Sequence, residues 1–459
     1  MNLISTLYPS SEYSPLKSKG LQQSLINIIG STIASGFAAI SLILLSRVLE
    51  PTYFGQFSTA FALTLILVRF NDLGLSVATS KLVPSADEGE RRVLLSLITR
   101  YRLAFSGLII VAGLILSQIL PNFLLQENPL LILIAFIVTF ATAFFEHAQF
   151  SLQATHRFTA AAILNAAQGM VKLVFVLPVI FLIGQGNLSL PVLTSGIFIF
   201  YMLAPVIPVL LALLSKPGVL PFSLTLPSDF SSERLTSIKK QLFSLMKHAG
   251  LGILAAGIIE NVDILIVQSY LNDHQAGLLG GVTRIALLLY IVGYAIGNVL
   301  NPRVAKYKKI EDLMSFWKKS WLIVVLCVLG FVLSMFIAQP LIIYTIGTSY
   351  LPALGALKIL LAAGFVTIAL MPFIAFFYSF NLSWYFSVSG ILQLMIVIGG
   401  NLWLVPVYGI EAAAWVRLVA RGLLLIFTIA LARWQLTQLS QEKLTTNNTE
   451  GSTAQNITG

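Results

Sequence analysis

The stretch that decides the fold is residues 36–74, GFAAISLILLSRVLEPTYFGQFSTAFALTLILVRFNDLG. It contains two apolar runs separated by the short turn Leu49-x5-Gly55. A helix crosses a hydrocarbon core of roughly 30 Å with about 20 apolar residues, and the two runs extend over residues 21–48 and 54–80, so each is long enough to span a membrane. A second copy of the turn, Leu271-x5-Gly277, follows 222 residues later (from 49 to 271), again between two apolar runs. The stretch predicts a helical membrane protein built from two related halves.

The composition excludes a water-soluble globule. Of the 459 residues, 57% are hydrophobic and only 10% are charged, whereas a soluble domain carries about 25% charged residues. The single cysteine, Cys327, and the four scattered histidines show no metal-ligand spacing, so we expect no metal site and no cofactor. The sequence has no Walker A pattern and no hydrophilic domain large enough for a soluble active site. These features indicate a transporter and not an enzyme.

The apolar runs predict an all-α integral membrane fold of about 12 spans. The expected spans are 21–48, 54–80, 93–117, 129–153, 158–183, 190–214, 245–270, 276–302, 319–338, 352–378, 383–405 and 411–434. They form two six-helix lobes, 21–214 and 245–434, joined by a cytoplasmic loop at 215–244. An even number of spans in each half gives a parallel repeat, related by a pseudo-two-fold axis along the membrane normal. Residues 1–20 are expected to form a cytoplasmic N-terminal segment and residues 435–459 a disordered cytoplasmic tail.

The positive charge of the chain is a matter of topology. The formal net charge is +10, and most of the 28 basic residues, Arg102 among them, fall in the predicted loops on one side. Basic loops face the cytoplasm, so both termini are expected to be cytoplasmic in a multi-pass membrane protein. Because this distribution accounts for the basicity, we do not expect nucleic-acid binding.

Ionisable residues inside the first-half spans are candidate functional groups, because charge at bilayer depth is costly and usually faces a protein interior or a water-filled path. Arg69 and Asp72 lie three residues apart, hence on one helix face, and Glu146 lies at a similar depth. Lys172 belongs to a polar stripe with Asn165. The alternative for these charges is a structural role as ion pairs between helices.

The second-half spans carry a further set of charges. Glu260 and Asp263 share a helix face, and Arg284 lies at about the depth of Asp263, which predicts an Asp263–Arg284 pair. Arg417 and Arg421 lie four residues apart with no acid nearby on their own helix. Over both halves, the predicted cationic substrate-binding set is Arg69, Lys172, Arg284, Arg417 and Arg421. The candidates for ion coupling or ion pairing are Asp72, Glu146, Glu260 and Asp263.

Three segments, taken together, resemble one known family. They are Ser46–Phe57 followed by Asn71–Leu75, then Glu260–Ile264 through Thr283–Ile285 to Asn301–Pro302, and finally Leu404–Ala414. The chain resembles the polysaccharide biosynthesis or O-antigen flippases (Wzx-type) of the multidrug/oligosaccharidyl-lipid/polysaccharide (MOP) exporter superfamily. The likeness extends over nearly the whole chain, although Glu411-Ala stands where that family often has a small residue.

The resemblance implies two six-helix lobes around a V-shaped cavity. The cargo would be a polyprenyl (undecaprenyl) pyrophosphate-linked oligosaccharide, flipped to the outer leaflet by alternating access for O-antigen, capsule or exopolysaccharide assembly. Asp72, Asp263 and Arg284 match the family's acidic and basic positions. The candidate coupling ion is H⁺ or Na⁺, and the expected partners are the lipid-linked oligosaccharide, membrane lipid and a polysaccharide polymerase.

Two other functions stay open at this stage. A multidrug/cation antiporter of the same superfamily would share the spans and lobes, but its pocket should be acidic and aromatic. A membrane polysaccharide polymerase would need a large outer loop, and the predicted outer loops are short. A lipid II flippase ranks lower, because such proteins usually have additional spans.

Overall fold

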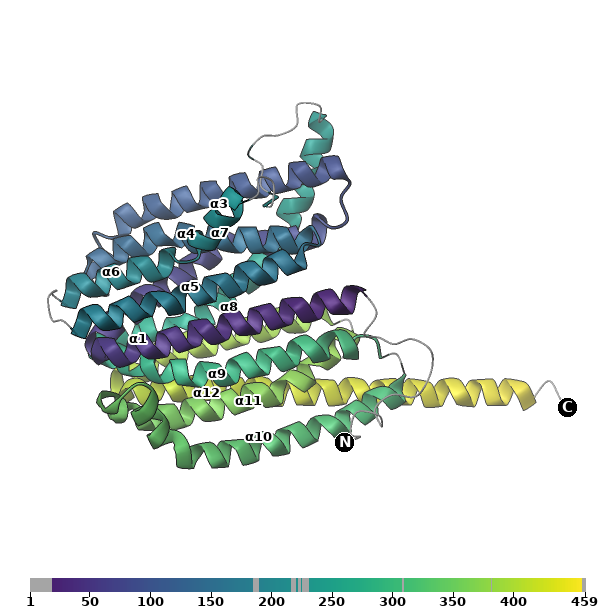
Figure 1. Ribbon diagram of the computed structural model, residues 1–459. Helices are drawn as coiled ribbons and strands as arrows, with labels where there is room; N and C mark the ends of the chain where they lie inside the picture. The colour runs from purple at the N-terminus through teal and green to yellow at the C-terminus, as the bar shows by residue number, and fades with distance from the viewer. Residues whose placement is uncertain are drawn as a thin grey trace.

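The computed structural model describes residues 19–184, 190–215, 220–221, 224, 231–307, 309–380 and 382–455, and every regular element within them is a helix. The N-terminal lobe consists of α1 (Lys19–Asp72), α2 (Leu75–Leu82), α3 (Glu88–Leu116), the short 3-10 helix η3 (Leu120–Asn122), α4 (Leu130–Ala154), α5 (Phe158–Gly184), α6 (Leu190–Leu203) and α7 (Val206–Ser215). The C-terminal lobe consists of α8 (Ser232–Tyr270), α9 (Asp273–Val304), α10 (Ile310–Thr345), η4 (Thr348–Ala353), α11 (Leu354–Ser379) and α12 (Ser383–Gln455). In Figure 1, α3 to α7 form one group and α9 to α12 form a second, with α1 and α8 running between them.

The prediction of about twelve spans is confirmed. Within the described residues, nine helices are long and apolar enough to cross a membrane, and the bent pair α6–α7 makes a tenth span. Two of the nine, α1 and α12, each consist of two helices joined across a kink, which brings the number of spans to twelve. The fold is therefore the predicted all-α, two-lobed membrane architecture.

Both kinks lie within three residues of a proline. In α1 the break falls at Glu50 (φ 59°), directly before Pro51, whose ring restricts the preceding residue and removes a backbone donor. In α12 it falls at Gly409 (φ 68°), three residues after Pro406, and glycine adopts positive φ without steric cost. Each kink turns the chain back across the membrane without a loop.

The lobes cross at the two turns that the sequence repeats. A Cβ atom at Gly55 would lie 1.8 Å from the carbonyl oxygen of Asp273, and one at Gly277 would lie 1.6 Å from that of Pro51. Pro51 and Gly55 become Asp273 and Gly277 when 222 residues are added, and Thr52 contacts His274, its own counterpart, at 3.3 Å. In a two-fold contact, a residue of one half meets a residue of the other half, and their counterparts meet in the same way. The pseudo-two-fold axis therefore passes through this crossing.

Apolar side chains join the lobes at this crossing and at a second place. One cluster of buried side chains includes Phe54, Ala276 and Tyr350 and draws on helices of both lobes. A second cluster packs α2 and α3 against the first turns of α8, and a third lies within the C-terminal lobe around Phe373. The lobes thus share apolar packing at the repeated turns and along the first turns of α8.

Several element boundaries differ from the prediction. The span expected over 54–80 is interrupted at Gly74 (φ 89°), which packs against Met246 and Gly250 of α8. Helix α8 begins at Ser232, inside the expected loop 215–244, because the Ser231 side chain caps the helix and Ile238 and Leu242 have apolar surface to bury on the N-terminal lobe.

Helix α12 continues to Gln455 through the tail that was expected to be disordered. Its residues 437–450 contain neither proline nor glycine, so nothing in that stretch ends the helix. Figure 1 shows this part of α12 projecting away from the bundle toward the C-terminus. The expected N-terminal segment 1–20 lies almost wholly outside the described residues.

Candidate functional site

A cavity of about 270 Å³ lies between the lobes. The N-terminal lobe contributes residues from α1, α5 and α6, and the C-terminal lobe contributes residues from α8, α9 and α12. Its polar and charged lining comprises Ser35, Lys172, Tyr201, Glu260, Asn261, Thr283, Arg284, Tyr290, Tyr294, Arg417 and Arg421. The structure thus brings four of the five predicted cations together with one carboxylate.

Lys172 enters the cavity from α5 and is 8% exposed. Its Nζ lies 4.8 Å from the centre of the Tyr201 ring, within the range of a cation–π contact. The Tyr201 hydroxyl lies 3.1 Å from Ser41 Oγ, which fixes the ring. Among the described residues, no carboxylate pairs with Lys172. Its ammonium group therefore has a pre-set position and an uncompensated charge.

Arg284 repeats this arrangement across the lobe interface. It extends from α9, is 7% exposed, and places its guanidinium carbon 5.0 Å from the centre of the Phe61 ring on α1. Its Nε has no hydrogen-bond partner among the described groups. A buried donor without a partner is costly unless a ligand or water completes it. The predicted Asp263–Arg284 pair is wrong, because Asp263 is bound by another arginine.

That arginine is Arg417. Its Nη2 donates to Asp263 Oδ2 in an ion pair, and also donates to the backbone carbonyl of Glu260 at 3.1 Å. The sequence showed no acid near Arg417 on its own helix, and the structure supplies one from another helix. The acid comes from α8, which packs against α12, and not from the arginine's own helix. Among the described residues, Arg417 is the one cation of the cavity that pairs with a carboxylate.

Glu260 and Arg421 complete the charged lining. Glu260 Oε1 accepts a hydrogen bond of 2.9 Å from the Tyr294 hydroxyl, which orients the carboxylate on the cavity wall. Arg421 lies one helical turn beyond Arg417 on α12 and forms no ion pair with the described acids. The cavity therefore holds Lys172, Arg284 and Arg421 as uncompensated cations against one uncompensated carboxylate.

The remaining predicted site residues form ion pairs inside the N-terminal lobe. Arg69 pairs with Glu146 on α4, and Arg69 is not part of the cavity lining described above. Asp72 pairs with Arg102 on α3, in a contact where both side chains are at most 5% exposed. The sequence placed Arg102 in a cytoplasmic loop, but α3 carries it into the lobe as the counter-charge of Asp72. These two pairs connect α1 to α4 and to α3.

Sequence reasoning missed the aromatic part of the site. Phe61 and Tyr201 each lie under a cation, and Tyr294 holds Glu260. Single aromatics in an apolar span resemble lipid-facing residues, so composition alone could not select them. One signal was present for α9, since Arg284, Leu287, Ile291 and Tyr294 are spaced by three or four residues along one helix face.

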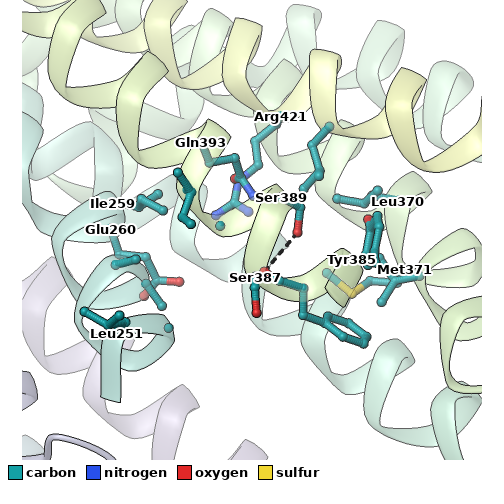
Figure 2. Close-up of a pocket in the computed structure, with 18 of the residues that line it drawn as sticks. Leu251, Ile259, Glu260, Leu370, Met371, Tyr385, Ser387, Ser389, Gln393 and Arg421 are labelled. Carbon is teal, nitrogen blue, oxygen red and sulfur yellow. Dashed lines mark hydrogen bonds between the residues drawn. The ribbon is translucent and has the colours of Figure 1, made fainter. Parts of the chain in front are cut away.

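A second cavity, of about 350 Å³, lies within the C-terminal lobe between α8, α9, α11 and α12. It shares Glu260, Tyr294 and Arg421 with the cavity between the lobes. We call the first the central cavity and this one the C-lobe pocket; Figure 2 shows the pocket's lining.

The fold and the sequence can now be compared with known proteins. A family model described as polysaccharide biosynthesis protein matches residues 21–216, which is the N-terminal lobe. No curated protein matches the chain in sequence. This match agrees, over the first lobe, with the family that the sequence motifs resemble.

Solved structures extend the likeness to the whole chain. The lipid II flippase MurJ in an inward closed conformation is similar with a TM-score of 0.69 and 12% identity, over 89% of this chain and 87% of that one. A multidrug resistance MATE family transporter of the MOP superfamily, inward-facing, is similar with a TM-score of 0.63 and 15% identity, over 91% and 96%. A MOP superfamily transporter from Pyrococcus furiosus, titled as having a binding pocket of reversed polarity, is similar with a TM-score of 0.57 and 14% identity, over 94% and 100%. The chain shares the fold of these proteins.

Proposed function

We propose that this protein flips a polyprenyl (undecaprenyl) pyrophosphate-linked oligosaccharide across the bacterial plasma membrane by alternating access, for surface polysaccharide assembly. The observation that carries the proposal is the charge of the central cavity. Lys172, Arg284 and Arg421 face Glu260 without other counter-ions among the described residues, which leaves the cavity net positive. A diphosphate diester carries a negative charge on each phosphate and so matches this excess.

The geometry of the cations suits a diphosphate that must enter and leave. Lys172 and Arg284 approach from different lobes, so one anionic head group can contact both lobes at once. Each cation is held over an aromatic face and not by a carboxylate, so binding the anion breaks no ion pair. Arg offers two parallel donors to phosphate oxygens, and Lys offers a point charge.

The transport step follows from the shared lining. When the lobes rock about their crossing at the repeated turns, Lys172 and Arg284 move relative to one another. The contacts that both side chains make with the diphosphate then change. The polyprenyl chain stays in lipid because it gains nothing from a polar cavity. Glu260 lies beside the cations and is the carboxylate best placed to bind H⁺ or Na⁺ and so reset the site. In this scheme both termini are cytoplasmic, and a polysaccharide polymerase uses the product.

The same charge count argues against the alternatives. A transporter of cationic drugs needs an acidic pocket, but here the cavity has three uncompensated cations for one uncompensated acid. The likeness to a multidrug transporter covers 91% of this chain at 15% sequence identity, and it is a likeness of fold.

The test is binding and flipping with defined lipids. Purified protein in lipid nanodiscs should bind undecaprenyl pyrophosphate, inorganic pyrophosphate should compete, and Lys172→Gln or Arg284→Gln should weaken binding at least tenfold, the scale of one lost charged hydrogen bond. Lys358→Gln is the matched control, because Lys358 lies in the membrane region of α11 but is exposed and outside the cavity lining. Proteoliposomes that flip no lipid-linked sugar and export an organic cation dye would replace the proposal with the antiporter.

A further inference from the structure

The C-lobe pocket branches from the central cavity toward α11 and the first half of α12. Glu260, Tyr294 and Arg421 line both spaces, so a ligand held by the central cations lies directly beside the entrance to the pocket. Its volume of about 350 Å³ is at the lower end of the range for small-molecule sites, roughly 300–1,000 Å³. The pocket is therefore a compartment for part of a ligand and not for a whole oligosaccharide.

The pocket wall carries polar groups at helical spacing. Ser389 and Gln393 lie one turn apart on α12, and Figure 2 shows them with Arg421 around the same space, with Glu260 on a different wall. Gln393 is 8% exposed, and its Oε1 is buried without a hydrogen-bond partner among the described groups. A buried amide oxygen without a partner destabilises the empty site, so this atom points to a ligand that donates a hydrogen bond.

The rest of the wall is apolar. Leu251, Ile259, Leu370, Met371 and Phe386 face the polar groups, and Tyr385 adds its ring. The Tyr385 hydroxyl is bonded to Thr428, so this residue offers the pocket a ring face and not a donor. A ligand that fits must present hydroxyl groups on one edge and C–H surface on another.

The charges define the class of ligand further. Glu260 accepts hydrogen bonds and repels anions, whereas Arg421 donates and repels cations, so an ion of either sign meets one unfavourable neighbour. A prenyl chain would leave Gln393 Oε1 and Arg421 buried against hydrocarbon, which is costly. A hydroxyl group has one donor and two acceptor sites, so a ring with several hydroxyl groups can donate to Gln393 Oε1 and to Glu260 and accept from Arg421.

We propose that the C-lobe pocket is a sugar subsite, in which a hydroxyl group of one sugar ring donates to Gln393 Oε1. The inference rests on the proposed function, which places the diphosphate in the central cavity and so brings the attached ring to the pocket entrance. Arg421 then lies at the junction, beside the diphosphate on one side and the ring on the other. The pocket makes the protein select lipids that carry a sugar over the bare carrier lipid.

The experiment compares two lipids on one preparation in nanodiscs. The probes are undecaprenyl pyrophosphate and the lipid-linked oligosaccharide extracted from the cells that make this protein. Wild type should bind the second lipid roughly five to ten times more tightly, the size of one to two net hydrogen bonds. Gln393→Leu should remove this difference and leave the affinity for undecaprenyl pyrophosphate unchanged, and Ser389→Ala should reduce the difference.

Asn401→Leu provides the matched control. Asn401 is a buried amide on the same half of α12, it lies outside both cavity linings, and its loss should leave the sugar-dependent difference intact. The sugar subsite is refuted if Gln393→Leu keeps the difference in affinity between the two lipids, or weakens the binding of both lipids equally. It is also refuted if wild type binds the two lipids with equal affinity. If undecaprenyl pyrophosphate also fails to bind wild type, the proposed diphosphate site in the central cavity is refuted as well. This result distinguishes failure of the proposed function from failure of the sugar subsite alone.

Discussion

The closest approach of the two lobes provides a stability prediction with a distance attached. Gly277→Ala would place a Cβ atom 1.6 Å from the carbonyl oxygen of Pro51, and ordinary van der Waals contact begins at 3.4 Å. The backbones must therefore separate locally by about 1.8 Å, which is 3.4 less 1.6. The atom in the way is backbone, so no side-chain rotation relieves the clash. Overpacking of this kind costs about 1–3 kcal/mol, occasionally more.

A control variant corrects the comparison for the intrinsic preference of alanine for helices. Gly107→Ala on α3 meets nothing within 4 Å, so it should gain up to about 1 kcal/mol from helix propensity alone. Because Gly277→Ala receives the same gain, the difference between the two variants isolates the clash. We expect purified Gly277→Ala to unfold at a lower temperature than Gly107→Ala, measured by tryptophan fluorescence in detergent.

The two-fold contact adds a sharper requirement. A Cβ atom at Gly55 meets Asp273 at the same crossing, at 1.8 Å, so one separation of the helices relieves both clashes. The double variant Gly55→Ala/Gly277→Ala should lose clearly less stability than the sum of the single losses. Equal stability of Gly277→Ala and Gly107→Ala, or full additivity in the double variant, would refute the reasoning.

Three further predictions concern charges. Asp263→Asn should lower stability by about 3–5 kcal/mol because it leaves Arg417 buried without its partner, and Asp263→Asn/Arg417→Gln should recover much of the loss in the same unfolding assay; a double variant no better than Asp263→Asn would contradict the pair. Lys172→Gln should reduce flipping of lipid-linked oligosaccharide in proteoliposomes while the amount of folded protein stays unchanged, and normal transport would remove Lys172 from the head-group site. The pKa of Asp87 is lowered below its ordinary value of 3.8, first because its carboxylate accepts a hydrogen bond from the backbone N–H of Glu90 and also because it lies beside Arg234, 2.8 Å away. The ionised Asp87 carboxylate therefore stabilises the fold fully above pH 3.8, and this contribution is lost as the pH falls through the lowered pKa. The unfolding temperatures of Asp87→Asn and wild type should converge at the most acid pH. A difference between them that widens at acid pH would contradict this prediction.

The fold could be predicted from the sequence because each membrane span depends only on the apolar residues of its own segment. Apolar runs of about 20 residues fix the number of crossings without reference to any partner. The repeated Leu-x5-Gly turns indicated two halves, and Gly55 and Gly277 meet where the halves touch. Boundaries were harder to predict wherever a neighbour decided them, as at Gly74 and at the start of α8 on the N-terminal lobe.

The site was predictable in its composition and not in its pairings. The sequence alone determined that costly charges lie at bilayer depth, and four of the five predicted cations line the central cavity. Which charge meets which depends on how helices rotate and pack, and helix rotation in a span apolar on all sides is weakly encoded. Only the tertiary structure therefore decided that Asp263 neutralises Arg417, that Arg102 lies buried against Asp72, and that Lys172 and Arg284 lie over aromatic rings with no carboxylate partner among the described residues.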